Sequence, residues 1–478
     1  MPNRQCLLVT PFSPSVRFRR TAMAGLPAGL LAAALLAASA ITARAVPSFA
    51  RQMNAQCTMC HSEFPVLNDM GRLFKLSGYT MSAEQSKLPP IAAMLQPSFT
   101  RTQKGQDGGA APGFGNNNNY ALTQASLFYS GRLLGPYASL LFGDSTAAFL
   151  NKFGIFSQVT YDGVGKSWSW DNIDLRYTDT AAMGAHSAIY GIYLNNNPTL
   201  QDPWNSVPAW SFPFSGSGLA PTPSAAPLID GGLAQQVLGL GAYMMIDSKL
   251  YVDLGAYKTL SRRVQRALGV DPSGETQVAS PAPYGRIAYT RPASGGTWET
   301  GAFGLLATTY PGRDASAGAD RITDIGVDSE FQKPYGTDDL TVLVTEIYER
   351  EHWNASQALG NTANAADSLN EFKASVDYLV DKTYGLAAQY FTINGSTDAL
   401  AYADSPDASP NSSGFILEVD YLPFNKGEGP AFWPRSNVKF SVQYTDYNRF
   451  DGSRANVDGT GRSAKNNNTL YFQAWIVF

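Results

Sequence analysis

The sequence predicts an all-β fold: a transmembrane outer-membrane β-barrel of about 16 strands with a small α-helical segment at its N-terminus. Aromatic residues reach 12% of the chain while charged residues reach only 15%, below the roughly 25% that is usual for soluble domains. From about Tyr120 onward, segments of roughly ten residues alternate apolar side chains with small or polar ones, as strands with one apolar and one polar face do. The connections between these segments are alternately short and long, which is typical of outer-membrane barrels.

Residues 1–45 have the features of a cleaved signal peptide. Arginines within residues 17–20 precede an apolar stretch over residues 22–41, and Ala-Arg-Ala at 43–45 matches the small-x-small cleavage pattern. The alternative is an uncleaved membrane anchor, since the stretch nearly reaches the ~20 residues that span a bilayer. We expect cleavage, with a mature chain that begins near Val46 and is exported to the outer membrane of a Gram-negative bacterium.

The mature chain retains two cysteines, and both lie in the pentapeptide Cys57-Thr58-Met59-Cys60-His61. This is the attachment pattern of c-type haem. A CxxC turn brings two sulfurs to one edge of a porphyrin, where they form thioethers, and the adjoining imidazole becomes the proximal ligand of the iron. The sequence therefore predicts one covalent haem c held by Cys57, Cys60 and His61.

Two other uses of a CxxC pair fit the sequence less well. A thioredoxin-like redox pair is expected beside a βαβ pattern, and a zinc site needs two further Cys or His residues nearby. Neither accompanies Cys57 and Cys60, because the other two histidines, His186 and His352, lie far along the chain. The same lack of a nearby distal histidine disfavours a haem enzyme such as a peroxidase, which needs an open sixth position and an acid–base residue.

The sixth ligand of the iron is expected to be a methionine. Met94 is the favoured candidate and Met81 the second, because both follow the attachment turn at a distance that allows the chain to fold over the ring. A packing role for either methionine remains open at this point. Thioether ligation would raise the reduction potential relative to a second histidine.

The predicted domains follow from these assignments. Residues 46–95 form the haem-binding segment, residues 96–119 a linker, and residues 120–478 the barrel. The segment is short for an independent cytochrome, and a barrel of about 16 strands has a wide lumen. We therefore expect the haem-binding segment to plug the lumen, so that the barrel covers the cofactor.

The end of the chain favours a membrane barrel over a soluble β-sandwich or propeller. Residues 470–478 place Leu470, Phe472, Ala474, Ile476 and Phe478 on one face of a last strand that ends at the C-terminus. Counting back from Phe478 to about Tyr120 predicts sixteen strands, although fourteen or eighteen remain possible and residues 99–101 offer another start. An even number places both ends of the barrel on the periplasmic side.

The balance of charged residues argues against a nucleic-acid partner, and the positions of some acidic residues suggest a cation. Lys plus Arg is 35 and Asp plus Glu is 39, so no basic field points to nucleic acid. Acidic residues of predicted loops are candidates for attracting a cation, or else ordinary solvated charges: Asp314, Asp320, Asp398, Asp404 and Asp407.

The opening of the mature chain resembles that of a known family. Residues 46–52 (Val-Pro-Ser-Phe-Ala-Arg-Gln), the CxxCH motif, Phe64-Pro65 and residues 71–80 (Gly-Arg-Leu-Phe-Lys-Leu-Ser-Gly-Tyr-Thr) are similar to the fused outer-membrane monohaem cytochrome–porins linked to iron oxidation. Residues 53–54 and 68–70 depart from that pattern, and residues 194–199 resemble an uncharacterised branch. The likeness covers the whole mature chain, with its specific part in residues 46–80.

The resemblance implies an electron-transfer function. Electrons would pass from an extracellular donor, ferrous iron in this family, through one haem to a periplasmic cytochrome or copper protein. As an enzyme, the chain would then be a ferrous iron:cytochrome oxidoreductase. The alternative is a solute porin in which the haem-bearing segment is a structural or redox-gating plug.

The attachment motif generates the first prediction. Cys57→Ala or Cys60→Ala should abolish the haem-staining band on a denaturing gel, because thioethers survive denaturation and axial ligands do not. A chain with Cys6→Ala should keep its stain, since Cys6 lies in the predicted signal peptide. Full staining of both attachment variants would rule out covalent haem at this motif.

Overall fold

The computed structural model describes residues 47–83, 88–207, 215–271, 276–426, 429–430 and 436–478, which belong to one compact unit. The predicted signal peptide, residues 1–45, lies outside the described residues. Among the described residues, no helix combines the length and the apolar character needed to cross a membrane. The helical elements are short: α2 (Pro47–Met53), η1 (Cys57–Met59), α3 (Asp69–Leu76), η2 (Gly135–Tyr137), α4 (Ala138–Phe142), α5 (Asp144–Leu150), η3 (Leu228–Gly232), α6 (Arg262–Ala267), α7 (Asn354–Ala358) and η4 (Ala464–Asn467).

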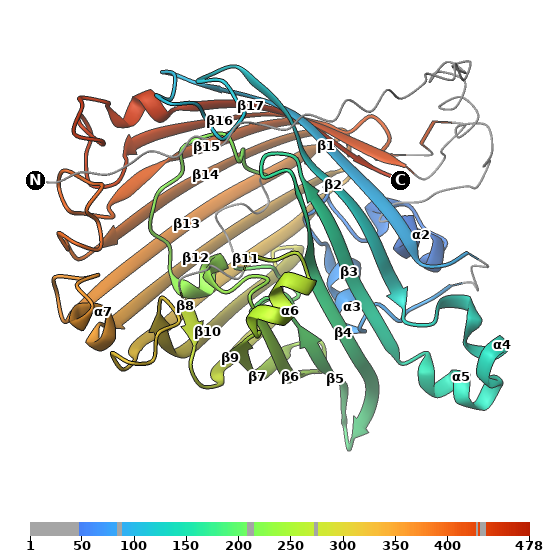
Figure 1. Ribbon diagram of the computed structural model, residues 1–478. Helices are drawn as coiled ribbons and strands as arrows, with labels where there is room; N and C mark the ends of the chain where they lie inside the picture. Colours follow the sequence, from blue (N-terminus) through green and yellow to red (C-terminus); the bar gives the residue numbers. More distant parts are fainter. Residues whose placement is uncertain (1–46, 84–87, 208–214, 272–275, 427–428, 431–435) are drawn as a thin grey trace, which may run out of the picture. The chain divides into compact units, whose positions relative to one another are not determined.

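The remaining elements form one antiparallel sheet, which in the described part of the chain has seventeen strands (Figure 1). The strands are β1 (Ile91–Thr102), β2 (Asn119–Arg132), β3 (Phe153–Asp162), β4 (Ser167–Met183), β5 (His186–Asn195), β6 (Val237–Ile246), β7 (Leu250–Thr259), β8 (Thr276–Val278), β9 (Ala282–Ala293), β10 (Gly296–Pro311), β11 (Asp320–Tyr335), β12 (Asp338–His352), β13 (Ala366–Val380), β14 (Tyr384–Gly395), β15 (Ser412–Tyr421), β16 (Asn437–Arg449) and β17 (Thr469–Val477).

The sheet closes on itself into a barrel. Each long strand pairs with the next, β7 pairs directly with β9, and β17 pairs with β1 through partners such as Phe99 and Phe472. The three-residue strand β8 lies outside this circle, where it extends the ladder of β10. Sixteen strands therefore make the wall, as the sequence predicted.

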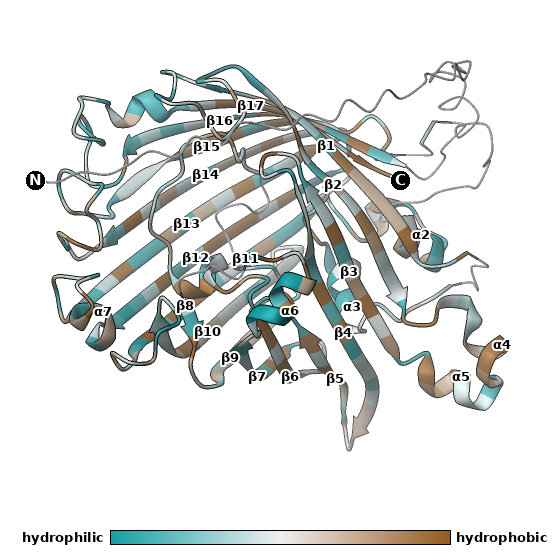
Figure 2. Cartoon of the chain, viewed as in Figure 1, coloured by the Kyte–Doolittle hydropathy of each residue, from teal (hydrophilic) through white to brown (hydrophobic). Residues whose placement is uncertain are grey.

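The two faces of the wall have the polarity of a membrane barrel. In β15, Leu417 and Val419 are exposed on the outer face, while Glu418 and Asp420 are buried on the inner face. Figure 2 shows the same alternation of hydrophobic and hydrophilic residues along many strands. Apolar side chains outside and charged side chains inside are what a barrel needs in lipid, where closure also satisfies every backbone hydrogen bond. The chain is therefore an outer-membrane β-barrel.

The connections differ between the two ends of the barrel. Short turns at residues 247–249, 294–295, 336–337 and 381–383 lie at the end that also holds the C-terminus, which is the periplasmic end. The connections at the other end are mostly longer, as predicted. Two connections at the periplasmic end are exceptions: 422–436, and 133–152, which contains α4 and α5.

The start of the barrel corrects the predicted domain boundaries. The first strand is Ile91–Thr102, so the N-terminal segment predicted to bind haem ends before residue 91. Residues 96–119 are not a linker but contain most of β1, a loop and the first residue of β2. The sequence pattern is weak there because the inward residues of β1 are small or neutral, and Pro97 sits at a bulge in the pairing with β2. The total of sixteen strands is right, but only fifteen of them begin at or after Asn119.

The N-terminal segment lies inside the barrel, at the end where the C-terminus lies (Figure 1). Arg72 of α3 donates to Glu330 of β11 at 2.5 Å, and the Tyr79 hydroxyl donates to Asp174 of β4 at 2.7 Å. Arg176 of β4 donates to the carbonyl oxygen of Lys75 at 2.8 Å. Because these partners are inward-facing residues of strands on different sides of the segment, the segment plugs the lumen.

Closure through the last strand generates the second prediction. Deleting residues 475–478 removes the pairing of Ile476 and Val477 with both β1 and β16, which leaves open strand edges in the membrane. We expect loss of heat-modifiable barrel on gels of outer-membrane fractions. Deleting residues 315–318, four residues of the β10–β11 loop, is the matched control and should leave assembly intact. Equal yields of the two deletion variants would contradict closure through β17.

Candidate cofactor site in the barrel lumen

The CxxCH motif folds into one tight turn. Cys57–Met59 form a single turn of 3-10 helix, and the backbone N–H groups of Cys60 and His61 both donate to the carbonyl oxygen of Cys57 at 3.0 Å. Cys57 and Cys60 are free thiols in this structure. The turn thus holds both sulfurs and the imidazole close together in the chain.

Helix α3 braces this turn from one side. Asn68 caps the helix by accepting from Gly71 N at 3.0 Å, donates its backbone N–H to Cys60 O at 3.0 Å, and donates from Nδ2 to Thr58 O at 3.2 Å. A Cβ on Gly71 would lie 2.0 Å from Cys60 O, so only glycine permits this close approach. Asn68, at one of the places where the chain departs from the cytochrome–porin pattern, therefore supports the attachment turn directly.

A cavity of about 710 Å³ lies beside the turn and is lined by Cys57, Cys60, His61 and Met94. This volume falls in the roughly 300–1,000 Å³ range of cofactor pockets. Met94 comes from β1 of the barrel wall and is 4% exposed. The structure thus brings together the three attachment residues and the favoured distal candidate, which the sequence separates by more than thirty positions.

The cavity walls are mostly apolar and come from both parts of the chain. Phe49 of α2 packs against Phe74 of α3 with ring centroids 4.8 Å apart, and Phe64 packs edge-on against Trp475 of β17 at 5.6 Å. Phe128 of β2 and Phe156 of β3 complete this aromatic lining from the barrel. Such walls would exclude water from a flat apolar group. Both the plug and the barrel are needed to form them.

The long β5–β6 connection contributes a further wall. Ser215 and Ser217 line the cavity, and they are tied to the barrel where Gln443 Nε2 donates to Ser215 O at 2.6 Å and Thr100 Oγ1 lies 2.5 Å from Ser217 Oγ. This connection begins and ends at the extracellular end of the barrel. The cavity is therefore bounded by the plug from the periplasmic end and by an inward-folded loop from the other.

The protonation states suit a haem ligand better than a redox thiol. Burial lowers the pKa of His61 to about 4, with the backbone of Pro65 and Val66 acting in the opposite direction, so the imidazole is neutral and able to bind metal. Burial raises the pKa of Cys57 and of Cys60 to about 11. Catalytic redox cysteines have lowered pKa values, so the direction of these shifts favours a ligand role over that of a dithiol oxidoreductase.

The cavity residues pass a test of fit to haem. The donor set is two thiols, a neutral imidazole and a thioether, which is the set that c-type haem uses. The Nε1 of Trp475 is buried without a hydrogen-bond partner among the described residues and belongs to a side chain that lines the cavity. An unsatisfied buried donor of this kind suits an acceptor on a bound group, such as a carboxylate.

The structure separates the distal candidates. Met94 Sδ accepts from Gln96 Nε2 at 3.5 Å within the cavity wall. Met81 is not among the described residues lining the cavity, and its carbonyl oxygen instead accepts from Gln52 at 2.7 Å. His186 and His352 are exposed at strand ends, which leaves them outside the cavity. Met53, at the end of α2, lines the cavity and was not favoured from sequence.

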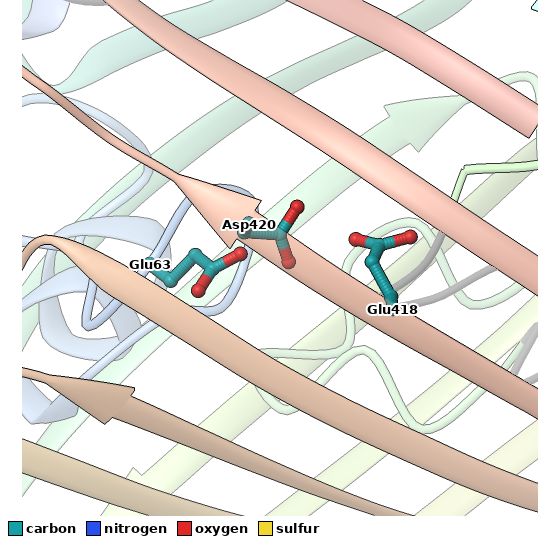
Figure 3. A group of neighbouring side chains, drawn as sticks. All are labelled: Glu63, Glu418 and Asp420. Carbon is teal, nitrogen blue, oxygen red and sulfur yellow. The ribbon is translucent and has the colours of Figure 1, made fainter.

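A buried cluster of three carboxylates ties the plug to the barrel wall (Figure 3). Glu63 of the plug lies beside Glu418 and Asp420 of β15, close enough together to suggest a metal site. Lys439 of β16, however, reaches all three, at 2.5 Å from Glu63, 2.9 Å from Glu418 and 3.3 Å from Asp420. The ammonium group takes the place that a metal ion would occupy, so the cluster is an ionic lock between plug and barrel.

The acidic loop residues divide into two groups. Asp320 and Asp398 are buried and accept from backbone N–H groups, those of Ala355 at 2.7 Å and of Ala363 at 2.8 Å. Asp314, Asp404 and Asp407 are exposed. Asp320 and Asp398 therefore stabilise loops and are not available to attract a cation, which corrects the expectation for these two.

Sequence reasoning missed most of the cavity wall. The barrel residues that line it, among them Gln96, Phe128, Phe156, Gln158 and Trp475, lie on five strands, β1 to β4 and β17, and share no motif. Their only signal in the sequence is an aromatic or amide side chain on the inward, usually small or charged face of a strand.

Comparison with known proteins gives a distant likeness to porins. No family model and no curated protein matches the chain. Among solved structures, it is similar to OprB of Pseudomonas putida (12% identity, 81% of this chain and 94% of that chain covered, TM-score 0.47). It is also similar to an anion-selective porin from Comamonas acidovorans (10%, 81% and 98%, 0.43) and to the channel DcaP of Acinetobacter baumannii (10%, 83% and 100%, 0.42). The barrel assignment rests on the closed sheet and its outer face.

The ionic lock generates the third prediction. Lys439→Met leaves three buried carboxylates without their cation, and we expect the free energy of unfolding to fall by about 3–5 kcal/mol. Lys426→Met is the matched control, because Lys426 pairs with Asp381 at the surface and such pairs contribute at most about 1 kcal/mol. Denaturant titration of both variants in phospholipid vesicles measures the difference. Equally small losses would show that the lock does not hold the plug.

Proposed function

We propose that the chain is an outer-membrane electron-transfer protein that carries one c-type haem in the lumen cavity. The observation that carries this proposal is an apolar cavity lined both by Cys57, Cys60 and His61 of the plug and by Met94 of the barrel. When bound, haem supplies one-electron chemistry at the iron. The proposal is independent of the distant likeness to porins.

The chain's own residues would hold and insulate the cofactor. Cys57 and Cys60 provide the two thioether sulfurs, His61 a neutral imidazole and Met94 a thioether from the opposite part of the fold. The aromatic walls exclude water, which favours the less charged, reduced form of a haem and so a high potential. No acid–base residue is required for electron transfer.

The placement of the cavity suits transfer across the outer membrane. Ala93, Met94 and Val477, which line it, lie at the periplasmic ends of β1 and β17, where a periplasmic cytochrome or copper protein would receive electrons. The donor is extracellular in this proposal. The resemblance in residues 46–80 makes ferrous iron the reductant to test.

A solute porin with a haem-bearing or gating plug is the second candidate. The observation that favours it is the wide, strongly charged lumen of a sixteen-strand barrel, with inward carboxylates such as Asp324, Glu349 and Glu371, a wall typical of water-filled channels. Conductance in planar bilayers distinguishes the two functions. A steady open pore in the intact protein favours the porin, and conductance that appears only when residues 47–83 are deleted favours the conduit.

The distal ligand generates the fourth prediction. Met94→Ala should remove the weak sulfur-to-iron absorption of the oxidised protein and lower the reduction potential, and each drop of about 59 mV is a tenfold change in the one-electron equilibrium. The variant should therefore be reduced incompletely by ferrous iron and fully by dithionite.

Two matched variants make this experiment specific. Met81→Ala should change neither the spectrum nor the reduction, because Met81 lies outside the cavity lining. Met53→Ala tests the other methionine of the lining. Loss of the sulfur band in Met53→Ala alone would move the ligand to α2, and a wild-type protein with this band that takes no electrons from ferrous iron would exclude iron as the donor.

A further inference from the structure

The connection between β2 and β3 departs from the pattern of the other turns at the periplasmic end. It contains two short helices, α4 and α5, joined at Gly143, whose φ of 75° turns the chain sharply. We call residues 138–150 the apolar hairpin. Asp144 is its only charged residue, and Figure 2 shows hydrophobic residues on both helices.

The apolar hairpin is packed with its small residues inward and its large residues outward. Ala138 and Ala147 are 2% and 1% exposed. Leu140 is 81% exposed, Leu141 62%, Phe142 52% and Phe149 54%. A helix in water places its large apolar residues against the protein instead, so this arrangement is unfavourable unless something apolar covers the outer face.

The apolar hairpin is continuous with the lipid-facing surface of the barrel. The ring of Phe149 lies 5.4 Å from that of Phe153 of β3 and 6.1 Å from that of Tyr177 of β4. Tyr177 points outward, because its neighbours Arg176 and Thr178 face the lumen, where both are buried. The hairpin therefore joins the outer, membrane-facing side of the wall and does not cover the lumen.

Polar groups at the same level mark the edge of the bilayer. Lys152, just after α5, forms an ion pair with Asp179 on the outer side of β4, and the Tyr177 hydroxyl donates to Asp179 Oδ2 at 3.2 Å. Aromatic rings beside charged groups are characteristic of the membrane–water interface. The C-terminal end of the apolar hairpin thus meets the barrel wall at the level where the wall leaves the hydrocarbon region.

From these contacts we propose that the apolar hairpin lies in the plane of the periplasmic leaflet, with Leu140, Leu141, Phe142 and Phe149 among phospholipid acyl chains. Short helices with one large apolar face insert in this way at the boundary between headgroups and acyl chains. The hairpin is an in-plane membrane contact of the barrel, separate from the cofactor cavity and independent of the proposed function.

Photo-crosslinking in native outer membranes tests this assignment. The full chain carries p-benzoylphenylalanine at Leu141, at Leu240 on the outer face of β6 as the lipid-facing reference, or at Leu400 in the extracellular β14–β15 loop as the exposed, lipid-free reference. Heat-modifiable migration first confirms that each variant folds. After irradiation, mass spectrometry of the purified chain identifies the adducts.

The assignment predicts phospholipid adducts at position 141 with a yield comparable to that at position 240 and well above that at position 400. Crosslinks from position 141 mainly to a second copy of the chain would make the hairpin an oligomer contact. Crosslinks mainly to a periplasmic protein would make it a docking surface, and a lipid yield no higher than at position 400 would leave the hairpin in water. Each of these three outcomes overturns the proposal.

Discussion

Backbone hydrogen bonding in a medium without water is the constraint on which the rest of this structure depends. A sheet in hydrocarbon has to pair every strand, so β17 must meet β1, and closure then separates an apolar exterior from a polar interior. The interior of a sixteen-strand barrel is too wide for its own side chains to fill. The N-terminal segment and the β5–β6 connection occupy this space, and both are held by inward-facing side chains such as Glu330 and Gln443.

The plug and the wall depend on each other energetically. Glu63, Arg72 and Lys75 are charged residues of the plug that lie buried in the lumen, where an unpaired charge is strongly unfavourable. Their partners come from the barrel and from the inward loop, including Lys439, Glu330 and the Asp202 carbonyl oxygen, which accepts from Lys75 at 2.6 Å. Removing the plug would take away the ion-pair partner of Glu330 and leave Lys439 with only its two barrel carboxylates, Glu418 and Asp420. The segment is therefore an integral part of the barrel's interior.

Local patterns predicted the fold well and long-range packing poorly. The period-two alternation of residues such as those of β15 predicts strands and their faces, because the polarity of each side chain matches the side of the wall on which it lies, lipid or lumen. For β1 the pattern predicts only a possible strand start at residues 99–101, because the inward residues of this strand are uncharged. Residues 91–95 are therefore assigned to the N-terminal segment and residues 96–102 to the linker, although all of them belong to β1. The helices α4 and α5 lie in a connection at the periplasmic end, where the alternation of short and long connections predicts a short turn. The CxxCH motif identified one side of the candidate site, whereas Phe128 and Trp475 reached it only through closure of the sheet.

The position of Met94 links the cavity to the seam of the barrel. Met94 pairs with Val477, at the end of the last strand, so the residue that faces the attachment turn belongs to the strand pair that completes the circle. The wall around the cavity is thus finished only when the chain's two terminal strands meet. A large rigid group attached to Cys57 and Cys60 before that event would be enclosed by the same strand pairing that completes the barrel. Folding of the barrel and enclosure of such a group from the β1–β17 side would then be one and the same step.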